Sequence, residues 1–344
     1  GITDVFNMAG LAAFGPSQAA ARLESSKAFA KAFMQEVGIP TAQAQTFTDF
    51  SAATDYLYAG EFTSGVVIKA SGLAAGKGVI VCDTLAEAEA ALNAIMVGRQ
   101  FGAAGDKVLI EERLQGPEVS VLAFSDGRTV RTMPPARDHK RVYDLDQGPN
   151  TGGMGAFAPP PDLPPNFAET IRKTVLEPVI EGIAQQGNSY VGVLYAGLML
   201  TPAGPRVLEF NCRFGDPETQ VILPLLETDL VEIAHACLAG NLDQVQLAIR
   251  PGACATVVMA APGYPGAYPR GLPIHGVDQA GQLPDVMVFQ AGTKEEHGQL
   301  VTNGGRVLAV SALGPDLPAA INQAYAGVEK IHFEGAHYRR DIGR

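Results

Sequence analysis

RVLEFNCRFGDPE, residues 206–218, begins as an alternating segment and ends in an acidic turn. Its first eight residues alternate between apolar and polar, which predicts a β-strand with one apolar face. The apolar face carries Leu208, Phe210 and Cys212. The polar face carries Glu209, Asn211 and Arg213. Carboxylate and amide oxygens suit Mg²⁺, and a neighbouring guanidinium can clamp a carboxylate or phosphate. The alternative is a half-exposed strand with a solvated polar face.

The residues on both sides of this strand favour a site over a solvated face. Residues 190–200 are predicted to form its partner strand, joined to it by a turn at residues 202–204. The acid-rich turn at residues 214–218 follows the polar row directly. So many carboxylates beside Glu209 would be costly without cations nearby.

The glycine-rich segment GLAAGKG, residues 72–78, lies between two short β-rich runs at 66–69 and 79–81. It is not a P-loop, because that motif has four residues between its glycines, then Lys-Ser/Thr and a helix. A glycine loop between strands can bring backbone amides close to phosphate oxygens. Lys69 and Lys77 would add two ammonium groups around one polyphosphate. The alternative is a simple glycine hairpin with exposed lysines.

Residues 134–165 are rich in Pro, Gly and Asp and are predicted to form a long loop, which is usually functional. DHKR at 138–141 supplies two cations, and NTGGMG at 150–155 supplies backbone donors without bulky side chains. Together they predict a site for a phosphorylated or carboxylated substrate. The alternatives are a solvated charge patch and a flexible turn. His139, a loop histidine flanked by charges, is not assigned to the chemistry.

The remaining elements follow from periodicity and turn signals. Helices are predicted at residues 25–37 (capped by Ser25 or Ser26), 84–97, 167–186, 229–239 and 316–329. Further strands are predicted at residues 108–112, 256–260, 286–290 and 306–310. Short strands and turns prevail after about residue 250, including a hairpin turn near residues 303–305, and predict a separate α+β domain.

Composition excludes several classes of protein. Hydrophobic residues make up 47% and charged residues 18% of the 344, which is enough for packed cores and argues against disorder. The formal net charge of −11 disfavours nucleic-acid binding. Four widely spaced cysteines form no CxxC pair, so they predict buried thiols in a reducing cytoplasm. No apolar run has the length of a membrane span, and no signal peptide is visible.

Taken together, these blocks resemble the glycinamide ribonucleotide synthetase family over nearly the whole chain. The matching blocks are SKAF at 26–29, IKASGLAAGKGV at 68–79, DHKR at 138–141, GPNTGGMGA at 148–156, EFNCRFGDPE at 209–218, GYPG at 263–266 and TNGGRV at 302–307. Ser71 departs from the family, which usually has aspartate there. The segment YAGL at 195–198 lacks the further acid that many related enzymes carry, as expected of this family.

The resemblance implies a fold of the α+β and α/β classes, namely an ATP-grasp fold with two α+β subdomains around ATP and a small carboxy-terminal α+β domain. The implied division is a remnant of a Rossmann-like domain at 1–24, the ATP-grasp domain at 25–248 with its lid at about 45–113, and the carboxy-terminal domain at 249–344. Family members begin with a complete Rossmann-like domain, so the chain is expected to be a truncated fragment.

The resemblance also implies roles for individual residues. ATP contacts are expected from Lys27, Lys69, Gly72, Gly76, Lys77, Gly78, Glu111, Glu112, Leu114 and Glu118. Substrate contacts are expected from Asp138, Lys140, Asn150, Thr151, Gly152, Gly153, Arg213 and Asp216. Mg²⁺, with Mn²⁺ as a substitute, is expected on Glu209 and Asn211, and catalytic roles are expected for Lys69, Lys140 and Arg213.

The reaction implied is the ATP-dependent ligation of glycine to 5-phosphoribosylamine through glycyl phosphate, a step of purine biosynthesis. The expected partners are these small molecules, without nucleic acid or membrane, and the expected state is a cytoplasmic monomer. Two alternatives stay open: an ATP-grasp ligase for another acid and amine, and a truncated fragment that binds ATP without turnover.

Overall fold

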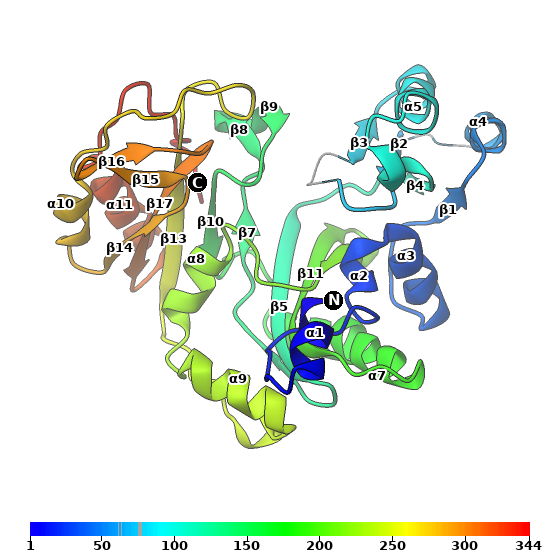
Figure 1. The fold of residues 1–344 in the computed structure, drawn as a ribbon, viewed down its shortest axis with the longest axis horizontal. Helices are drawn as coiled ribbons and strands as arrows, with labels where there is room; N and C mark the ends of the chain where they lie inside the picture. Colours follow the sequence, from blue (N-terminus) through cyan, green and yellow to red (C-terminus); the bar gives the residue numbers. More distant parts are fainter. Residues whose placement is uncertain (61, 63, 75–77) are drawn as a thin grey trace.

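The computed structural model of the chain describes residues 1–60, 62, 64–74 and 78–344, and three sheets of four or five strands organise them (Figure 1). The first sheet has the strand order β1-β4-β2-β3, with every pair antiparallel. Its strands are β1 (Ala44–Phe47), β2 (Val66–Ala70), β3 (Val79–Cys82) and β4 (Val108–Glu112). The strands predicted at 66–69, 79–81 and 108–112 are thereby confirmed.

Two helices pack together against this first sheet, α4 (Phe50–Ala59) and α5 (Leu85–Leu92). Thr84 caps α5, because its side chain accepts from the amide of Glu87 while the Glu87 side chain reaches back to the cap. The predicted helix at 84–97 continues through a π-helical turn, η1 (Asn93–Val97), and a 3₁₀ turn, η2 (Gly102–Gly105), follows it. These elements form the upper right of Figure 1.

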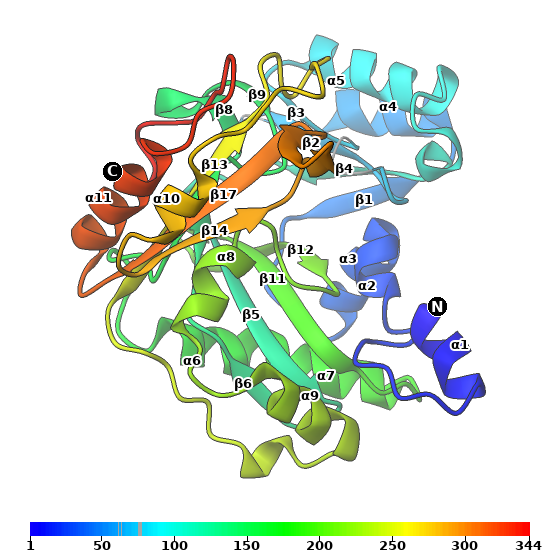
Figure 2. The ribbon, with the colours of Figure 1, turned by 60° about the vertical axis from the view of Figure 1, so that its left-hand side comes forward.

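The second sheet, ordered β12-β11-β5-β6, runs through the centre of the molecule (Figures 1 and 2). Its strands are β5 (Glu118–Asp126), β6 (Val130–Thr132), β11 (Val191–Thr201) and β12 (Gly204–Asn211). The helices near it are α1 (Ile2–Met8), α2 (Arg22–Ser25), α3 (Lys27–Glu36), α6 (Phe167–Ile171), the π-turn η4 (Arg172–Leu176), α7 (Glu177–Gln185) and α9 (Leu230–Ala239). Helix α3 and the α6–α7 run share one core with this sheet, and α9 packs in a second core with it. The cap of α3 is Ser26, whose side chain accepts from the Phe29 amide.

A β-bulge corrects the predicted alternation of β12. The pairing of β11 with β12 slips between Gly197, opposite Glu209, and Leu198, opposite Val207, so that Leu208 is the extra residue. Val207 is therefore buried in the core, whereas Leu208 is only partly buried. From Glu209 onward the predicted order holds, with Phe210 buried and Glu209 exposed.

The third sheet, ordered β14-β17-β13-β10-β7, combines two distant parts of the chain. Its strands are β7 (Arg137–Asp138), β10 (Gly155–Ala158), β13 (Ala253–Ala260), β14 (Val286–Gln290) and β17 (Arg306–Gly314). Helix α11 (Leu317–Val328), capped by Asp316, packs on β13 and β17. The sheet appears at the left of Figure 1, and Figure 2 brings α11 forward.

Two predictions for turns and loops need correction. The expected loop at 134–165 contains β7, β10 and a two-stranded ribbon, β8 (Arg141–Tyr143) with β9 (Gln147–Asn150), because its backbone groups pair with other strands. The expected hairpin turn near 303–305 joins two different sheets. Strand β16 (Gln299–Thr302) pairs with β15 (Thr293–Glu296), whereas β17 pairs with β13 and β14.

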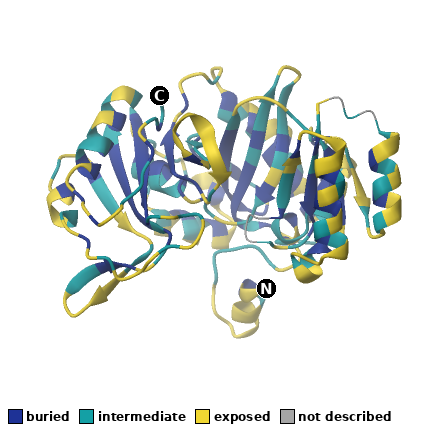
Figure 3. Cartoon of the chain, turned by 90° about the horizontal axis from the view of Figure 1, so that it is seen from above, coloured by how far each residue is buried: buried dark blue, intermediate teal, exposed yellow. Residues whose placement is uncertain are grey.

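The remaining elements are short: α8 (Thr219–Ile222), α10 (Val277–Gly281) and the 3₁₀ turns η3 (Asp144–Asp146), η5 (Leu223–Leu225) and η6 (Leu242–Gln244). Figure 3 shows that buried residues follow the sheets, whereas the helix near the N-terminus is largely exposed. Across the part of the chain that the structure describes, no helix combines the length and the apolar character of a membrane span.

Candidate active site

A buried cluster of charged side chains lies where the first sheet meets β12. The Glu111 carboxylate accepts from both Lys69, at 2.8 Å, and Lys31, at 3.3 Å, and all three side chains are at most 8% exposed. Lys69 also donates to the carbonyl oxygen of Leu208 at 3.2 Å. The lysine therefore ties β2 to the bulge of β12, directly beside the predicted metal row.

Lys31 was not predicted as a site residue. Its ammonium donates to Thr41 Oγ1 at 2.7 Å and to the carbonyl of Ala42 at 3.1 Å, and Thr41 Oγ1 in turn donates to the carbonyl of Val207 at 2.7 Å. Lys31 and Lys27 are four residues apart on α3, so they share one face of the helix. This spacing was available in the sequence as a signal.

Lys27, at the first turn of α3, stands close to the same cluster. Burial lowers the pKa of its ammonium, while the nearby Glu209 opposes that shift and Lys69 adds to it. Burial likewise lowers the pKa of Lys31 against the effect of Glu111. Lys31 and Lys69 thus share one buried carboxylate, and Lys27 lies near them together with the acids Glu209 and Glu24.

The predicted row on β12 is present, with Glu209 and Asn211 two residues apart on one side of the strand. Arg213 donates to Glu24 Oε1 at 3.2 Å and lies 3.4 Å from Asn211 Oδ1. Glu24, from α2, also accepts from the Cys212 amide at 2.8 Å. Because Glu24 holds the end of this row, it is a supporting residue that the sequence analysis missed.

Residues expected to contact adenine and ribose lie at the ends of β4 and β5. Glu111 is inside β4, paired on both sides, and its side chain belongs to the lysine cluster. Glu112 forms two hydrogen bonds with Gln43: its carboxylate accepts from the Gln43 amide, and its own amide donates to the Gln43 carbonyl. Leu114 is partly buried in the connection from β4 to β5.

Two glycines of the glycine-rich segment pack within their own subdomain. A Cβ atom added to Gly72 would lie 2.7 Å from the Ala104 Cα atom, and the Gly72 amide donates to the Ala104 carbonyl at 3.0 Å. The Gly78 carbonyl accepts from the Ala70 amide at 2.8 Å. Gly76 and Lys77, predicted to contact ATP, lie outside the described residues.

The second charged group joins Asp138, Lys140 and Glu118. Lys140 forms a short ion pair with Glu118, which was predicted to bind ribose. Burial raises the pKa of Asp138 to about 7, although Lys140 acts in the opposite direction. Burial alone would lower the pKa of Lys140, but the carboxylates of Asp138 and Glu118 outweigh it and raise that pKa.

A buried polar network lies close to these charges and was missed in the sequence. The Tyr195 hydroxyl donates to Glu218 Oε1 at 2.7 Å, and Ser120 Oγ lies 2.7 Å from that hydroxyl and 3.3 Å from the same carboxylate oxygen. Glu218 is 3% exposed. Burial raises the pKa of Tyr195 well above its ordinary value, and Glu218 and Asp138 add to the effect. Tyr195 and Glu218 belong to quoted motifs, but no spacing rule links them.

The segment from Asn150 to Met154 contradicts one part of the prediction, namely that its amides are available as anion donors. Asn150 pairs with Arg141 in the β8–β9 ribbon. The next four amides donate within the protein, in order to the Lys140 carbonyl, the Tyr264 hydroxyl, Thr151 Oγ1 and the His139 carbonyl. Gly153 has a φ of +110°, and a Cβ there would lie 2.3 Å from Pro217. The segment is therefore a fixed support.

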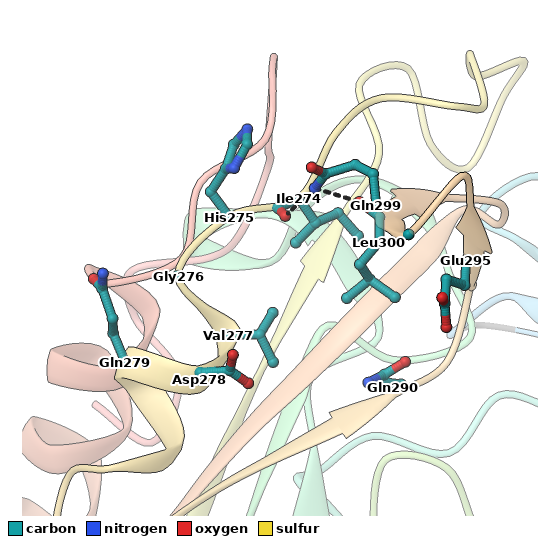
Figure 4. A pocket seen from close by; sticks show the side chains of 11 residues that line it. Ile274, His275, Gly276, Val277, Asp278, Gln279, Gln290, Glu295, Gln299 and Leu300 are labelled. Atoms are coloured by element: carbon teal, nitrogen blue, oxygen red, sulfur yellow. Dashed lines mark hydrogen bonds between the residues drawn. The ribbon is translucent and has the colours of Figure 1, made fainter.

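A pocket of about 520 Å³ lies away from all these groups, between α10 and the β15–β16 hairpin (Figure 4). Gln299 Nε2 crosses one side of it, donating to the carbonyls of Ile274 at 3.1 Å and Leu300 at 3.3 Å. The polar side chains of Asp278, Gln290 and Glu295 surround the rest (Figure 4). Among the described residues, its lining contains none of the predicted site residues.

Comparison of the sequence with protein families gives two matches. The phosphoribosylglycinamide synthetase ATP-grasp (A) domain matches residues 25–219, and the C domain of the same synthetase matches residues 254–344. A phosphoribosylamine–glycine ligase of Nostoc sp. is 53% identical over 346 residues, covering 100% of this chain and 80% of that protein. The trifunctional purine biosynthetic protein adenosine-3 of Gallus gallus is 52% identical over 344 residues. The chain spans only 34% of the length of that relative.

Solved structures agree with these matches. The phosphoribosylamine–glycine ligase of Thermotoga maritima superposes with a TM-score of 0.86 at 39% identity, covering 96% of this chain and 81% of that one. The biotin carboxylase domain of Hydrogenobacter thermophilus 2-oxoglutarate carboxylase gives a TM-score of 0.76 at 18% identity, with 98% and 72% covered. The second likeness extends to the fold alone.

Proposed function

The chain belongs to the phosphoribosylglycinamide synthetase family, and from this premise we propose that it ligates glycine to 5-phosphoribosylamine with ATP, giving glycinamide ribonucleotide, ADP and phosphate. The predicted ATP-grasp fold is confirmed by the domain match and by the superposition on the Thermotoga maritima ligase. The activity and substrates of the whole enzyme are proposals for this chain, since it spans about a third of its multifunctional relatives.

One observation carries the proposal: Lys31 and Lys69 share the single buried carboxylate of Glu111, and the half-buried Lys27 lies near enough to Glu209, Lys69 and Glu111 for all three to act on its pKa. Burying ammonium groups is unfavourable unless negative charge compensates them. One buried carboxylate cannot balance two buried ammonium groups, so the buried part of the site has a local positive surplus although the chain as a whole carries −11. A polyphosphate supplies the missing negative charge. The lysine cluster is therefore proposed as the ATP phosphate site, and Gly72, Gly76, Lys77 and Gly78 are proposed as further ATP contacts.

Glu209 and Asn211 are proposed to hold Mg²⁺, or Mn²⁺ in its place. Their donor set fits a hard cation, because a carboxylate and an amide oxygen lie two residues apart on one side of β12. Such an ion, when bound, supplies positive charge to phosphate oxygens. Lys69 reaches the same strand at Leu208, so its ammonium is well placed to neutralise the transferring phosphoryl group.

The chemistry requires that glycine be activated, because a carboxylate oxygen is a poor leaving group. Transfer of the γ-phosphoryl group from ATP to the glycine carboxylate gives ADP and glycyl phosphate. The amine of phosphoribosylamine then attacks the acyl carbon, phosphate leaves, and the amine loses a proton. Catalysis of both steps rests mainly on positioning and charge neutralisation. We assign Lys69, Lys140 and Arg213 to charge neutralisation.

The substrate side is proposed to lie along Asp138, Lys140 and the segment from Asn150 to Gly153. Asp138 is assigned to the glycine ammonium, which would lower the pKa that burial raises to about 7. Because the amides of the segment, the Thr151 hydroxyl and the Gly152 carbonyl are already used, its contacts to substrate are assigned to the Asn150 side chain and the remaining carbonyls. Arg213 and Asp216, beside the metal row, complete the proposed set.

Adenine and ribose are proposed to contact Glu112, Leu114 and Glu118, with Glu111 acting through the lysine cluster. The proposed domains are those expected from the sequence, 1–24, 25–248 with a lid at about 45–113, and 249–344, with β7 and β10 of the second domain contributing two strands to the sheet of the third. The proposed state is a cytoplasmic monomer that binds small molecules.

The test is ADP release by the purified chain with Mg²⁺, ATP, glycine and phosphoribosylamine. We expect release only when both glycine and phosphoribosylamine are present. Glu209→Gln should reduce turnover about 10²–10³-fold, as removal of one preorganised charge-stabilising group does. The exposed Glu334→Gln is the matched control and should leave turnover unchanged.

Other outcomes separate the alternatives. ADP release with a different acid and amine, but not with this pair, would identify another ligase of the same fold. Binding of Mg²⁺·ATP in a calorimeter without turnover would identify a nucleotide-binding fragment. Full turnover by Glu209→Gln would contradict the metal assignment.

A further inference from the structure

Arg306, the first residue of β17, reaches out of the carboxy-terminal sheet and binds two segments of the proposed active site. Its Nη1 atom donates to the carbonyl of Gly152 at 2.8 Å and to the carbonyl of Asp216 at 3.0 Å. Its Nη1 and Nη2 atoms also bind Asp216 Oδ1 at 3.1 Å and Oδ2 at 3.0 Å. A planar guanidinium suits such a two-pronged contact, which fixes orientation as well as distance.

Tyr264 binds the other backbone group of the same residue, Gly152. The Gly152 amide donates to the Tyr264 hydroxyl at 3.0 Å, so both backbone groups of Gly152 are bound by side chains of the carboxy-terminal domain. The tyrosine ring packs with Val142, Met154 and Ala260. A Cβ on Gly305 would lie 2.3 Å from that ring, so only glycine at this position, next to Arg306, lets the ring pack against the backbone.

Asp216 connects this contact to the metal row. Its carboxylate accepts from Gln220 Nε2 at 2.9 Å in addition to Arg306, so donors approach it from two sides. Asp216 follows Arg213 by three residues and Asn211 by five, in the turn that continues β12. A further contact joins the glycine segment to the turn after β12, because Gly153 packs directly on Pro217.

We propose that Arg306 and Tyr264 are positioning residues, which hold the segment from Asn150 to Met154 at one fixed separation from the turn after β12. The inference rests on the proposed function, since it assigns this segment to the substrate side. The carboxy-terminal domain then contributes to the reaction without touching the reactants. The lysine cluster is built from α3, β2 and β4 and makes no use of either residue.

Kinetics of the chain with Arg306→Met and Tyr264→Phe test the proposal. We expect Arg306→Met to raise the KM for phosphoribosylamine at least about tenfold, since displacement by about 1 Å can cost up to about 10²-fold. The Kd of Mg²⁺·ATP should change less than about twofold, because the lysine cluster makes no use of Arg306. A tenfold change in Kd would need a loss of about 1.4 kcal/mol in binding free energy. Arg306→Lys should not restore the KM, because an ammonium cannot make the two-pronged contact. The exposed Arg270→Met is the matched control.

Amide hydrogen exchange at residues 151–154 gives a readout that does not need turnover. Faster exchange there in Arg306→Met and Tyr264→Phe, with unchanged exchange in β2 and β4, is the expected result. Tyr264→Phe removes one hydroxyl, so it serves if Arg306→Met does not fold. Equal effects on phosphoribosylamine and ATP, or unchanged KM and exchange in a folded variant, would overturn the proposal. Loss of the proposed function alone would appear as an inactive wild type whose exchange still responds to Arg306→Met.

Discussion

The lysine cluster and the glycine segment at 150–154 differ in how far their polar groups are paired within the protein. In the cluster, the two buried ammonium groups outnumber the carboxylate between them, and the three side chains come from elements within the first 112 residues. In the segment, the successive amides are satisfied, and the groups that satisfy Gly152 come from residues more than a hundred positions away. A charge surplus indicates a ligand, whereas complete pairing indicates a support. The glycine run, which looks like an anion cradle in the sequence, belongs to the second kind.

Removing the carboxylate from the lysine cluster should have the largest effect on the free energy of unfolding. Glu111→Gln leaves the buried lysines without their counter-charge, and we expect a loss of about 3–5 kcal/mol in the free energy of unfolding. Urea unfolding monitored by circular dichroism measures it. Saturating Mg²⁺·ATP should restore part of the loss, because the polyphosphate replaces negative charge. The exposed Glu181→Gln is the control, and equal stability of the two variants would refute the charge-surplus argument.

A change at Asp138 should have an effect on stability that depends on pH. Its folded-state pKa is raised from 3.8 to about 7, so the folded protein keeps a proton that the unfolded chain releases. The associated stability is fully present below about pH 3.8 and is lost as the pH rises through 7. Asp138→Asn should therefore gain stability relative to the wild type between pH 4 and pH 8. Unfolding at several pH values measures this, with the exposed Asp278→Asn as control. A difference that stays constant with pH would contradict it.

The smallest effect is expected within the glycine segment. Thr151 Oγ1 donates to the Lys140 carbonyl at 2.8 Å and accepts from the Gly153 amide at 3.0 Å. Thr151→Val should cost about 1 kcal/mol of unfolding free energy, the usual net value of such a bond. It should also speed exchange of the Gly153 amide. If the exposed Thr48→Val changed both quantities equally, the support role of the segment would be wrong.

How far the sequence could predict these regions depends on the range of the contacts. The alternation of β12 and the strands around the glycine-rich loop are local patterns, and both were recovered apart from the bulge at Leu208. Strand β5 was missed, although it lies at the centre of its sheet between β11 and β6, because its buried residues form a nearly continuous run without alternation.

The site shows the same limit. Lys69 and Glu209 were found because they stand in dense motifs, and Lys31 could have been found from its spacing to Lys27. Arg306 and Tyr264 lie in motifs that match the family, TNGGRV and GYPG, but no role was predicted for either side chain. Their partners are Asp216 and Gly152, at least 90 residues away, and no local rule connects such positions.

The strand order of the third sheet has a consequence for how the chain can be divided. Strand β10 has β13 on one side and β7 on the other, so a segment that lies between β6 and β11 of the central sheet shares one layer with strands that follow β12. A protein cut just before Ala253 would keep β7 and β10 but leave a row of backbone donors and acceptors open along β10, a surface that invites pairing between copies. A fusion that adds another protein to this chain therefore has to be joined outside this layer. The carboxy-terminal region therefore cannot be removed or exchanged without exposing the edge of β10.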